Sequence, residues 1–261
     1  MEAIIFTANP FLALADVVSP AVMQGYLVLM ALAVAAGTVF DMLHKQSAKF
    51  FAQEWLASQT HAKRRLGSGE IASLAARTLL KEVAASGEFC KPARRLSHLL
   101  MSYGFVIYLL TTIVMVCAYP TEATPTPAAL PLLWHFGALM VAVGGYWFFF
   151  LLRVDVAHEG RSPFHLVHAD LFIVSLLGSV SFALVWAFMQ TTAYPAVAWV
   201  FFALYVFFST LLFVSVPWSK FAHMFYKPVV ALQRRVEEAN GSSRLPAAAA
   251  PGGKRCRPSH T

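Results

Sequence analysis

The sequence predicts an all-α membrane protein, a polytopic bundle of five transmembrane helices. Three observations predict it: the composition, five long apolar segments, and the placement of the basic residues. Of 261 residues, 58% are hydrophobic and only 13% are charged, whereas about 25% are charged in an ordinary soluble domain. The mean hydropathy is +0.62, and the apolar segments approach or exceed the roughly 20 residues that cross a hydrocarbon core.

The five apolar segments divide the chain into pieces on alternating sides of the membrane. Residues 1–20 form a short segment before the first span, and a 44–95 loop follows that span. The membrane domain covers 21–235, and the remaining 236–261 are predicted to be disordered because Ala, Pro, Gly and Ser dominate there. The predicted spans are 21–43, 96–119, 132–152, 168–190 and 196–216.

All 20 Lys and Arg residues fall on one side of this predicted topology. Ten, two and eight of them lie in pieces 44–95, 153–167 and 217–261, and none lies in pieces 1–20, 120–131 and 191–195. Cytoplasmic loops are enriched in Lys and Arg because positive charge resists translocation. We therefore expect the N-terminus outside and the C-terminus in the cytoplasm. The net charge of +7 then reflects topology, with a basic surface facing anionic lipid or a partner, and does not indicate nucleic-acid binding.

The 44–95 loop contains two amphipathic helical patterns. The first includes Phe51 and Trp55, and the second runs from Ile71 to Val83. Such helices lie on the bilayer surface or pack against a partner, and the pattern leaves both interpretations open. Basic residues of this loop are candidates for docking a partner, although ordinary positive-inside topology also explains them. The candidates are Lys63, Arg64, Arg65, Arg94 and Arg95.

Histidines are the residues most indicative of chemistry. His98 begins the second span and His223 follows the fifth, so both lie at the predicted cytoplasmic face. Two imidazoles from different helices at one depth are what a six-coordinate haem b requires. The alternative interpretation is that both are interfacial polar residues at helix ends.

Other residues fit the same haem hypothesis. Glycines in spans two and three would give room for a porphyrin, although close helix packing is their more common use; they are Gly104, Gly137, Gly144 and Gly145. Cations near the two histidines would contact the propionates through charge-assisted hydrogen bonds; they are Arg94, Arg95, Lys220 and Lys227. We expect Asp41 and Asp170 to be helix-end residues that reach water.

Two stretches resemble a known family. Arg94 to Phe105 (RRLSHLLMSYGF) and Pro217 to Tyr226 (PWSKFAHMFY) are similar to the second and last spans of nitrate reductase gamma-type cytochromes b. Relatives of that family include the membrane subunits of Qmo, Dsr and heterodisulfide reductase complexes. The resemblance covers about residues 20–230, with span count and orientation, and the basic loop before span two resembles the Qmo and Dsr branch. In general character and length, the chain most resembles the membrane anchor of dissimilatory adenylylsulfate reductase.

The resemblance implies electron exchange between membrane quinones and a soluble reductase on the cytoplasmic face. In members with two haems, the second and last spans each carry two histidines. Here His98 and His223 match the pair nearer the cytoplasm, and Tyr108 and Tyr205 occupy the other two positions. Neutral tyrosine is a poor axial ligand, and a phenolate would bury a charge. We therefore expect the second haem to be absent, which argues against electron transfer across the whole membrane.

The expected function is therefore a membrane anchor and electron-transfer subunit with at most one haem b. It is a non-catalytic or quinone-reactive part of an oxidoreductase complex. The chain has no CxxC pair, so any iron–sulfur cluster belongs to a partner that carries flavin and iron–sulfur centres. Residues for a quinone site, or fallback haem ligands, are Tyr103, His165, His168 and Asp170. Two alternatives remain: a cofactor-free structural anchor, and a transporter or channel, for which no repeats or broken helices are evident.

Overall fold

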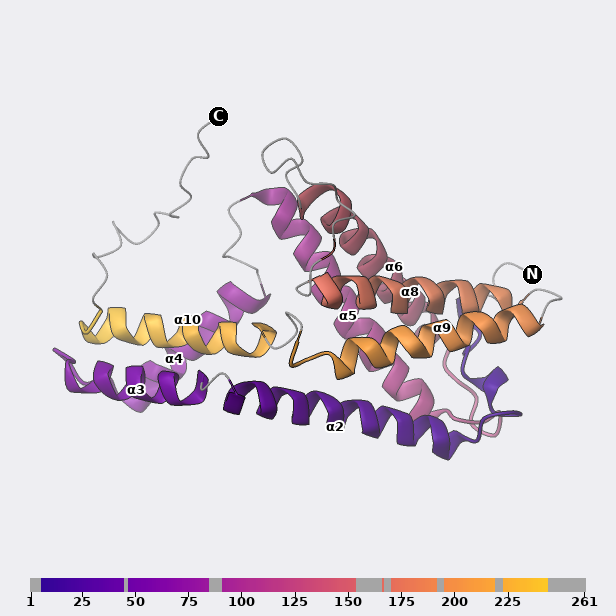
Figure 1. Cartoon of the computed structure of the whole chain (residues 1–261), viewed down its shortest axis with the longest axis horizontal. Helices are drawn as coiled ribbons and strands as arrows, with labels where there is room; N and C mark the ends of the chain where they lie inside the picture. The colour runs from indigo at the N-terminus through magenta and orange to yellow at the C-terminus, as the bar shows by residue number, and fades with distance from the viewer. Residues whose placement is uncertain are drawn as a thin grey trace. The chain divides into compact units, whose positions relative to one another are not determined.

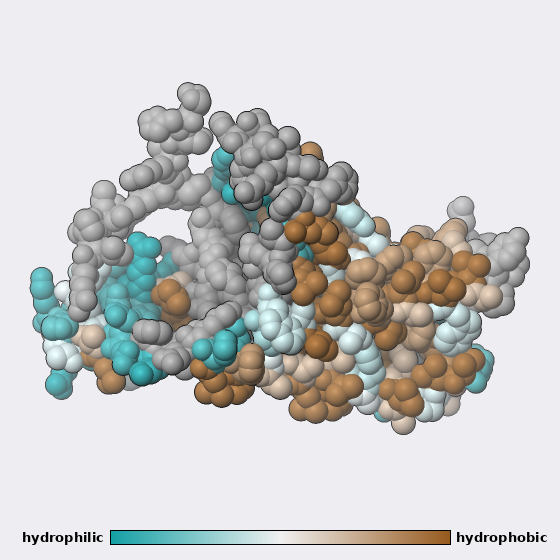
Figure 2. Space-filling view, viewed as in Figure 1, coloured by the Kyte–Doolittle hydropathy of each residue, from teal (hydrophilic) through white to brown (hydrophobic). Residues whose placement is uncertain are grey.

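The computed structural model describes residues 6–44, 47–84, 91–153, 166, 170–191, 195–218 and 223–243. These residues form helices and no strand. Five of the helices are long and apolar enough to cross a membrane, by length and composition, so the predicted all-α fold with five spans is confirmed. Figure 1 shows their course, and Figure 2 shows apolar residues covering much of the visible surface of the spans.

The spans are four uninterrupted helices and one that ends in a π-helical turn. Three of them begin at a proline (Pro20, Pro92 and Pro195). Proline suits the first turn of a helix because a backbone N–H at that position would have no acceptor within the helix. The central span α8 is the most buried, and α2 is the most exposed. The spans are α2 (Pro20–His44), α5 (Pro92–Ala118), α6 (Ala129–Trp147) with η3 (Phe148–Leu152), α8 (Leu171–Met189) and α9 (Pro195–Val214).

The chain forms two compact units. The first, which we call the bundle unit, comprises Met1–Thr38 and Leu96–Lys220. The second, which we call the basic unit, comprises Val39–Arg95 and Phe221–Thr261. By sequence, the basic unit holds every Lys and Arg except Arg153, Arg161 and Lys220.

The bundle unit is held together by close contacts between neighbouring spans. Helix α8 packs along α9 and also against α6, and the Ser179 and Ser209 hydroxyls share a hydrogen bond of 2.8 Å between α8 and α9. The α5–α6 pair is joined by Ser97, whose hydroxyl donates to the Gly144 carbonyl at 2.8 Å. Hydrogen bonds between buried hydroxyls satisfy polar groups that lipid cannot.

A short N-terminal segment closes one end of the bundle, the end at which α5 finishes and α6 begins. We call it the capped end, and the opposite end the Arg153 end. The segment contains the 3₁₀ turn η1 (Leu12–Leu14). Asn9 is buried, and its amide donates to the Tyr119 carbonyl and to the Thr126 hydroxyl. Gln190, just beyond α8, donates to the Pro10 carbonyl. These bonds fix the segment across loops that are distant in sequence.

The basic unit contains the helices predicted in the 44–95 loop and one further amphipathic helix. Helix α10 packs against α3, α4 and η2. Within the apolar stripes of α3 and α4, Trp55, Ile71 and Leu74 are half-buried, whereas Leu56 and Leu79 are exposed. The elements are α3 (Ser47–Thr60), α4 (Ser68–Thr78), the π-helical η2 (Leu79–Ala84) and α10 (His223–Asn240).

Helix α10 corrects one sequence-based boundary. We expected disorder from residue 236 onward, but α10 continues to Asn240, and Val236 and Asn240 are both buried. The physical reason is tertiary: the Asn240 carbonyl accepts the backbone amides of Lys63 and Arg64, at 2.9 and 3.2 Å. Residues 244–261 of the predicted tail lie outside the described residues.

Candidate functional site

The centre of the bundle unit holds a cluster of aromatic and hydroxyl side chains. Tyr108 on α5 and Tyr205 on α9 are both buried, and their hydroxyl groups lie close enough to interact. Trp134 lies against Tyr108, at 5.4 Å between ring centroids, and Trp186 stacks on Tyr205 at 5.7 Å. Phe11 reaches in from the capped end and contacts both tryptophan rings, at 6.0 and 5.4 Å.

The polar atoms of this cluster are almost all engaged within the protein. The Trp134 indole N–H donates to the Thr112 hydroxyl at 2.9 Å, and that hydroxyl donates to the Tyr108 carbonyl at 2.8 Å. The Tyr205 hydroxyl lies beside those of Tyr108 and Ser209. The Tyr108 oxygen makes no hydrogen bond of standard geometry to the described residues. Side chains therefore occupy the space between α5 and α9 where the family resemblance would position a second haem.

His98, the predicted haem ligand on α5, is half-buried. Its Nδ1 atom lies 3.3 Å from the Ser102 hydroxyl, one turn later on the same helix. A hydrogen bond at one ring nitrogen is the usual way in which proteins orient an imidazole for binding a metal through the other. This contact fits the expected ligand role of His98, and the sequence analysis did not identify Ser102. His223 is the first residue of α10, and its side chain lies outside the described residues.

The glycines of spans two and three allow close helix packing and do not open space for a porphyrin. A Cβ at Gly104 would lie 2.7 Å from the Gly137 carbonyl oxygen, and one at Gly144 would lie 2.8 Å from the Ser97 carbonyl oxygen. A Cβ at Gly145 would lie 2.7 Å from the Leu177 side chain. These glycines bring α5, α6 and α8 into contact and leave no room for a porphyrin between α5 and α6.

Asp170 and Asp41 are buried, so the expectation that they reach water was wrong. Asp170 is 7% exposed and pairs with Arg153, which also lies over the Phe149 ring at 4.5 Å. Asp41 is 2% exposed. Arg153 follows η3 and Asp170 precedes α8, so the ion pair joins the third and fourth spans at the Arg153 end. The Asp170 carboxylate is thus used in packing, which counts against its predicted role at a quinone site.

The remaining predicted site residues are distributed differently. Tyr103 is 48% exposed on α5, toward the surroundings of the bundle. Arg94 is exposed and Arg95 half-buried at the start of α5. His165, His168 and Lys220, and the side chain of Lys227, lie outside the described residues.

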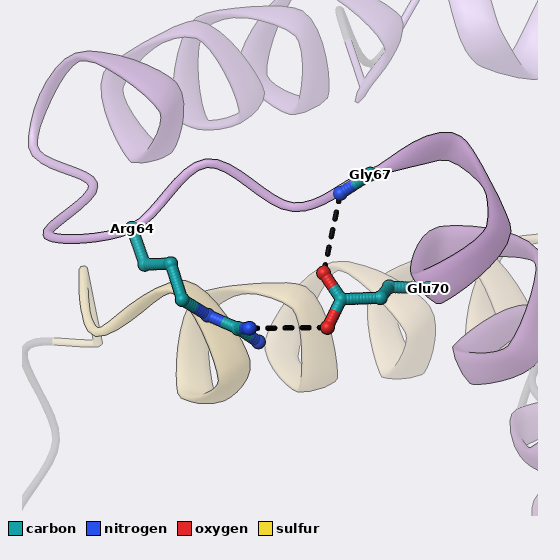
Figure 3. Close-up of polar contacts among 3 residues, drawn as sticks. All are labelled: Arg64, Gly67 and Glu70. Atoms are coloured by element: carbon teal, nitrogen blue, oxygen red, sulfur yellow. Dashed lines mark hydrogen bonds and ion pairs between the residues drawn. The ribbon is translucent and has the colours of Figure 1, made fainter.

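The predicted docking residues Lys63, Arg64 and Arg65 form the loop between α3 and α4, and all three are exposed. Figure 3 shows that Arg64 pairs with Glu70 at 3.1 Å, while the other oxygen of Glu70 accepts the Gly67 amide at 3.2 Å. This exposed ion pair contributes little stability, about 0–1 kcal/mol. Because the loop amides also cap α10, Lys63 and Arg64 have structural roles, whereas no such contact involves the Arg65 side chain within the described residues.

Sequence reasoning also missed three other structural features. Phe11 enters the aromatic cluster, Arg153 is buried in an ion pair, and Asn240 joins α10 to the loop before α4. Of these three features, only the ion pair of Arg153 had a signal in the sequence. A single arginine directly after an apolar segment is expected to have an ionic partner if it is buried. In the part of the chain that the structure describes, no three metal-binding side chains gather around one point.

Comparison with known proteins adds no further assignment, since no protein-family description, curated protein or solved structure matches this chain significantly. The fold and the apolar helices define the class: a multi-pass membrane protein with five spanning helices. Its bundle encloses an aromatic and hydroxyl cluster, and its second unit carries most of the basic residues.

Proposed function

We propose that this chain is the membrane anchor and electron-transfer subunit of an oxidoreductase complex in a bacterial inner membrane. It holds a soluble flavin and iron–sulfur reductase, for which adenylylsulfate reductase is our candidate, on the cytoplasmic face and links it to quinone. The observation that carries the proposal is the meeting of Tyr108 on α5 with Tyr205 on α9. Axial ligands on the second and last spans require those spans to face each other. The nearness of Tyr108 and Tyr205 supports such an arrangement of α5 and α9.

One haem b is the proposed cofactor, with His98 and His223 as axial ligands. The hydrogen bond between His98 and Ser102 supports this choice because it would orient the ring. Arg94, Arg95, Lys220 and Lys227 are the proposed propionate contacts. When bound, a haem b supplies one-electron transfer at a potential set by its axial ligands. Exchange with quinone would use Tyr103, which is partly exposed, and His165 and His168, which precede α8 in the sequence.

The basic unit is the proposed docking platform. Its charge supports this role because a positive surface attracts and orients an acidic partner before contact. Arg65 is the best test residue, since its side chain is exposed and makes no hydrogen bond or ion pair with the other described residues. Arg65→Glu is expected to reduce co-purification of a reductase that has flavin and iron–sulfur absorbance. Glu54→Gln, also exposed in this unit, is the control, and equal recovery with both variants would contradict docking through this loop.

The haem is tested by a reduced-minus-oxidised spectrum of the purified chain. An α-band of b-type haem is expected, and its loss in both His98→Ala and His223→Ala identifies the ligands. His61→Ala is the matched control, because His61 is exposed at the end of α3 and its loss is expected to leave the band unchanged. Retention of the band in both ligand variants would overturn the assignment.

A cofactor-free anchor is the second candidate function, and one observation favours it. Phe11, Trp134 and Trp186 pack around the two tyrosines, so aromatic side chains occupy the space next to the positions where the second pair of ligands was expected. Tyrosine at both positions expected for the second pair of haem ligands also supports a chain without a cofactor. Absence of any haem band in a folded preparation, together with a bound reductase, would establish this alternative.

A further inference from the structure

A pocket lies in the capped half of the bundle unit, between α2, α5 and α9. Its volume is about 160 Å³. None of the functions discussed above uses it. The lining residues are Phe11, Val18, Val22, Met23, Tyr26, Leu27, Thr112, Val116, Phe202, Tyr205 and Val206.

The lining is almost wholly hydrocarbon. The Tyr26 hydroxyl is engaged by Thr210 at 3.0 Å, and the Thr112 hydroxyl is engaged by Trp134 and by the Tyr108 carbonyl. The Tyr205 hydroxyl lies beside Tyr108 and Ser209. Each hydroxyl of the lining therefore has a neighbour within the protein, and the pocket presents carbon to its occupant.

The pocket is continuous with the lipid-facing surface of the spans. Val22 both lines the pocket and is 60% exposed on α2. On the same helix, Val28 and Leu29 are exposed, as large apolar side chains in a membrane-spanning helix are when they contact acyl chains. Phe11 lines the pocket and also contacts Trp134 and Trp186 in the central cluster. The pocket thus extends from the lipid-facing surface toward the bundle interior.

The size and chemistry of the pocket select its occupant. An apolar cavity of about 150 Å³ excludes water and accepts a small hydrocarbon. We propose that this pocket binds the end of one acyl chain of a membrane phospholipid. A quinone is a less suitable occupant because its ring oxygens need hydrogen-bond donors, and the hydroxyls of the lining are engaged within the protein.

The test uses the full chain in bilayer discs that contain phosphatidylcholine with a photoreactive diazirine near the end of one acyl chain. After irradiation, mass spectrometry of peptides locates the attached lipid. Labelling at Met23 and Tyr26 is expected for the wild-type chain. Val206→Trp fills the pocket from α9, so that labelling is expected to be lost.

Val200→Trp is the matched control, because Val200 is on the same helix, is 58% exposed and does not line the pocket. Labelling at Met23 and Tyr26 is expected to persist in that variant. Val22→Phe, which fills the pocket from α2, provides a second test if circular dichroism shows that Val206→Trp does not fold. Unchanged labelling in a folded filling variant would overturn the proposal. Loss of wild-type labelling on adding excess lipid-soluble quinone would also overturn it, since quinone would then be the occupant.

Discussion

At the scale of single residues, Gly104 and Gly137 determine how closely α5 and α6 pack. A Cβ at Gly137 would lie 2.8 Å from the Tyr108 backbone nitrogen and 2.9 Å from the Gly104 carbonyl oxygen. Membrane helices have little hydrophobic drive to associate, so they depend on such close backbone contact. These two glycines are therefore structural residues, and they fix the position of the helix that carries His98.

Gly104→Ala is expected to lower the free energy of unfolding by about 1–3 kcal/mol, because the added methyl group overpacks the contact with Gly137 and Met140. Thermal unfolding of the detergent-solubilised chain measures the change. Gly25→Ala is the matched control, since a Cβ there meets nothing within 4 Å. It also has the gain in helix propensity that alanine brings, about 1 kcal/mol. Equal unfolding temperatures for the two variants would show that α5 and α6 do not pack in this way.

The Arg153–Asp170 ion pair is the second feature at the scale of single residues. Here the prediction concerns the removal of a charged partner, and not the addition of a methyl group. Asp170→Ala leaves the guanidinium of a buried ion pair without its carboxylate, which is expected to cost about 3–5 kcal/mol of stability. The double variant Arg153→Met/Asp170→Leu is expected to recover most of that loss, because an apolar pair needs no charge compensation. Asp16→Ala, at an exposed position, is the control. Failure of the double variant to recover stability would mean that the pair has another role.

At the scale of secondary-structure elements, α10 shows how one helix organises the basic unit. Its last residue, Asn240, donates from its side chain to the Ser58 carbonyl at 3.4 Å and accepts the Ser242 amide at 2.9 Å. Gly241 follows with a φ of 78°, the left-handed conformation that ends many helices and favours glycine. The end of α10 is thus connected to α3 and to the loop before α4.

Gly241→Ala is expected to weaken this connection, because a non-glycine residue in the left-handed region costs about 1–2 kcal/mol. The side chain of Lys63, whose Cδ would lie 3.2 Å from the new Cβ, would also have to move. Faster hydrogen exchange at the amides of residues 233–240 is the expected readout. Gly69→Ala, at a position with open space, serves as the control. Unchanged exchange in Gly241→Ala would argue against the helix ending described.

How far the sequence predicted each element depended on whether its signal was local. The five spans were predictable because an apolar segment of sufficient length must be a helix in lipid, and the helices of the 44–95 loop were predictable from their apolar stripes. The end of α10 and the position of Phe11 were not predictable, because both depend on partners more than 100 residues away. The glycines had two local interpretations, and only their neighbours in space distinguished them.

At the scale of the whole molecule, the distribution of charge matches the division into units. The bundle unit contains only three Lys and Arg residues by sequence, whereas the basic unit contains the rest. The 44–95 loop precedes the four later spans in the sequence and α10 follows them, yet the two pack together in one unit. Four spans, an even number, separate the two pieces of the basic unit in the sequence, so both pieces fall on one side of the bilayer.

Cysteine labelling is expected to show the N-terminus outside and the basic unit in the cytoplasm. In a chain whose native cysteines are replaced by serine, Glu122→Cys is exposed in the α5–α6 loop. A membrane-impermeant maleimide is expected to label it in intact cells, because that side lacks the basic residues that resist translocation. Arg65→Cys is expected to react only after the membrane is permeabilised. The reverse pattern would overturn the orientation, and with it the proposed cytoplasmic partner.

The N-terminal segment has a consequence for biogenesis. Its Asn9 donates hydrogen bonds to Tyr119 and Thr126, and Pro10 accepts one from Gln190. These partners lie more than 100 residues later in the sequence, so the segment leaves the ribosome long before they are synthesised. Insertion of the early helices must therefore proceed with this stretch unattached. It can settle into place only after the fourth span has entered the bilayer, which makes its docking a late step in the maturation of the protein.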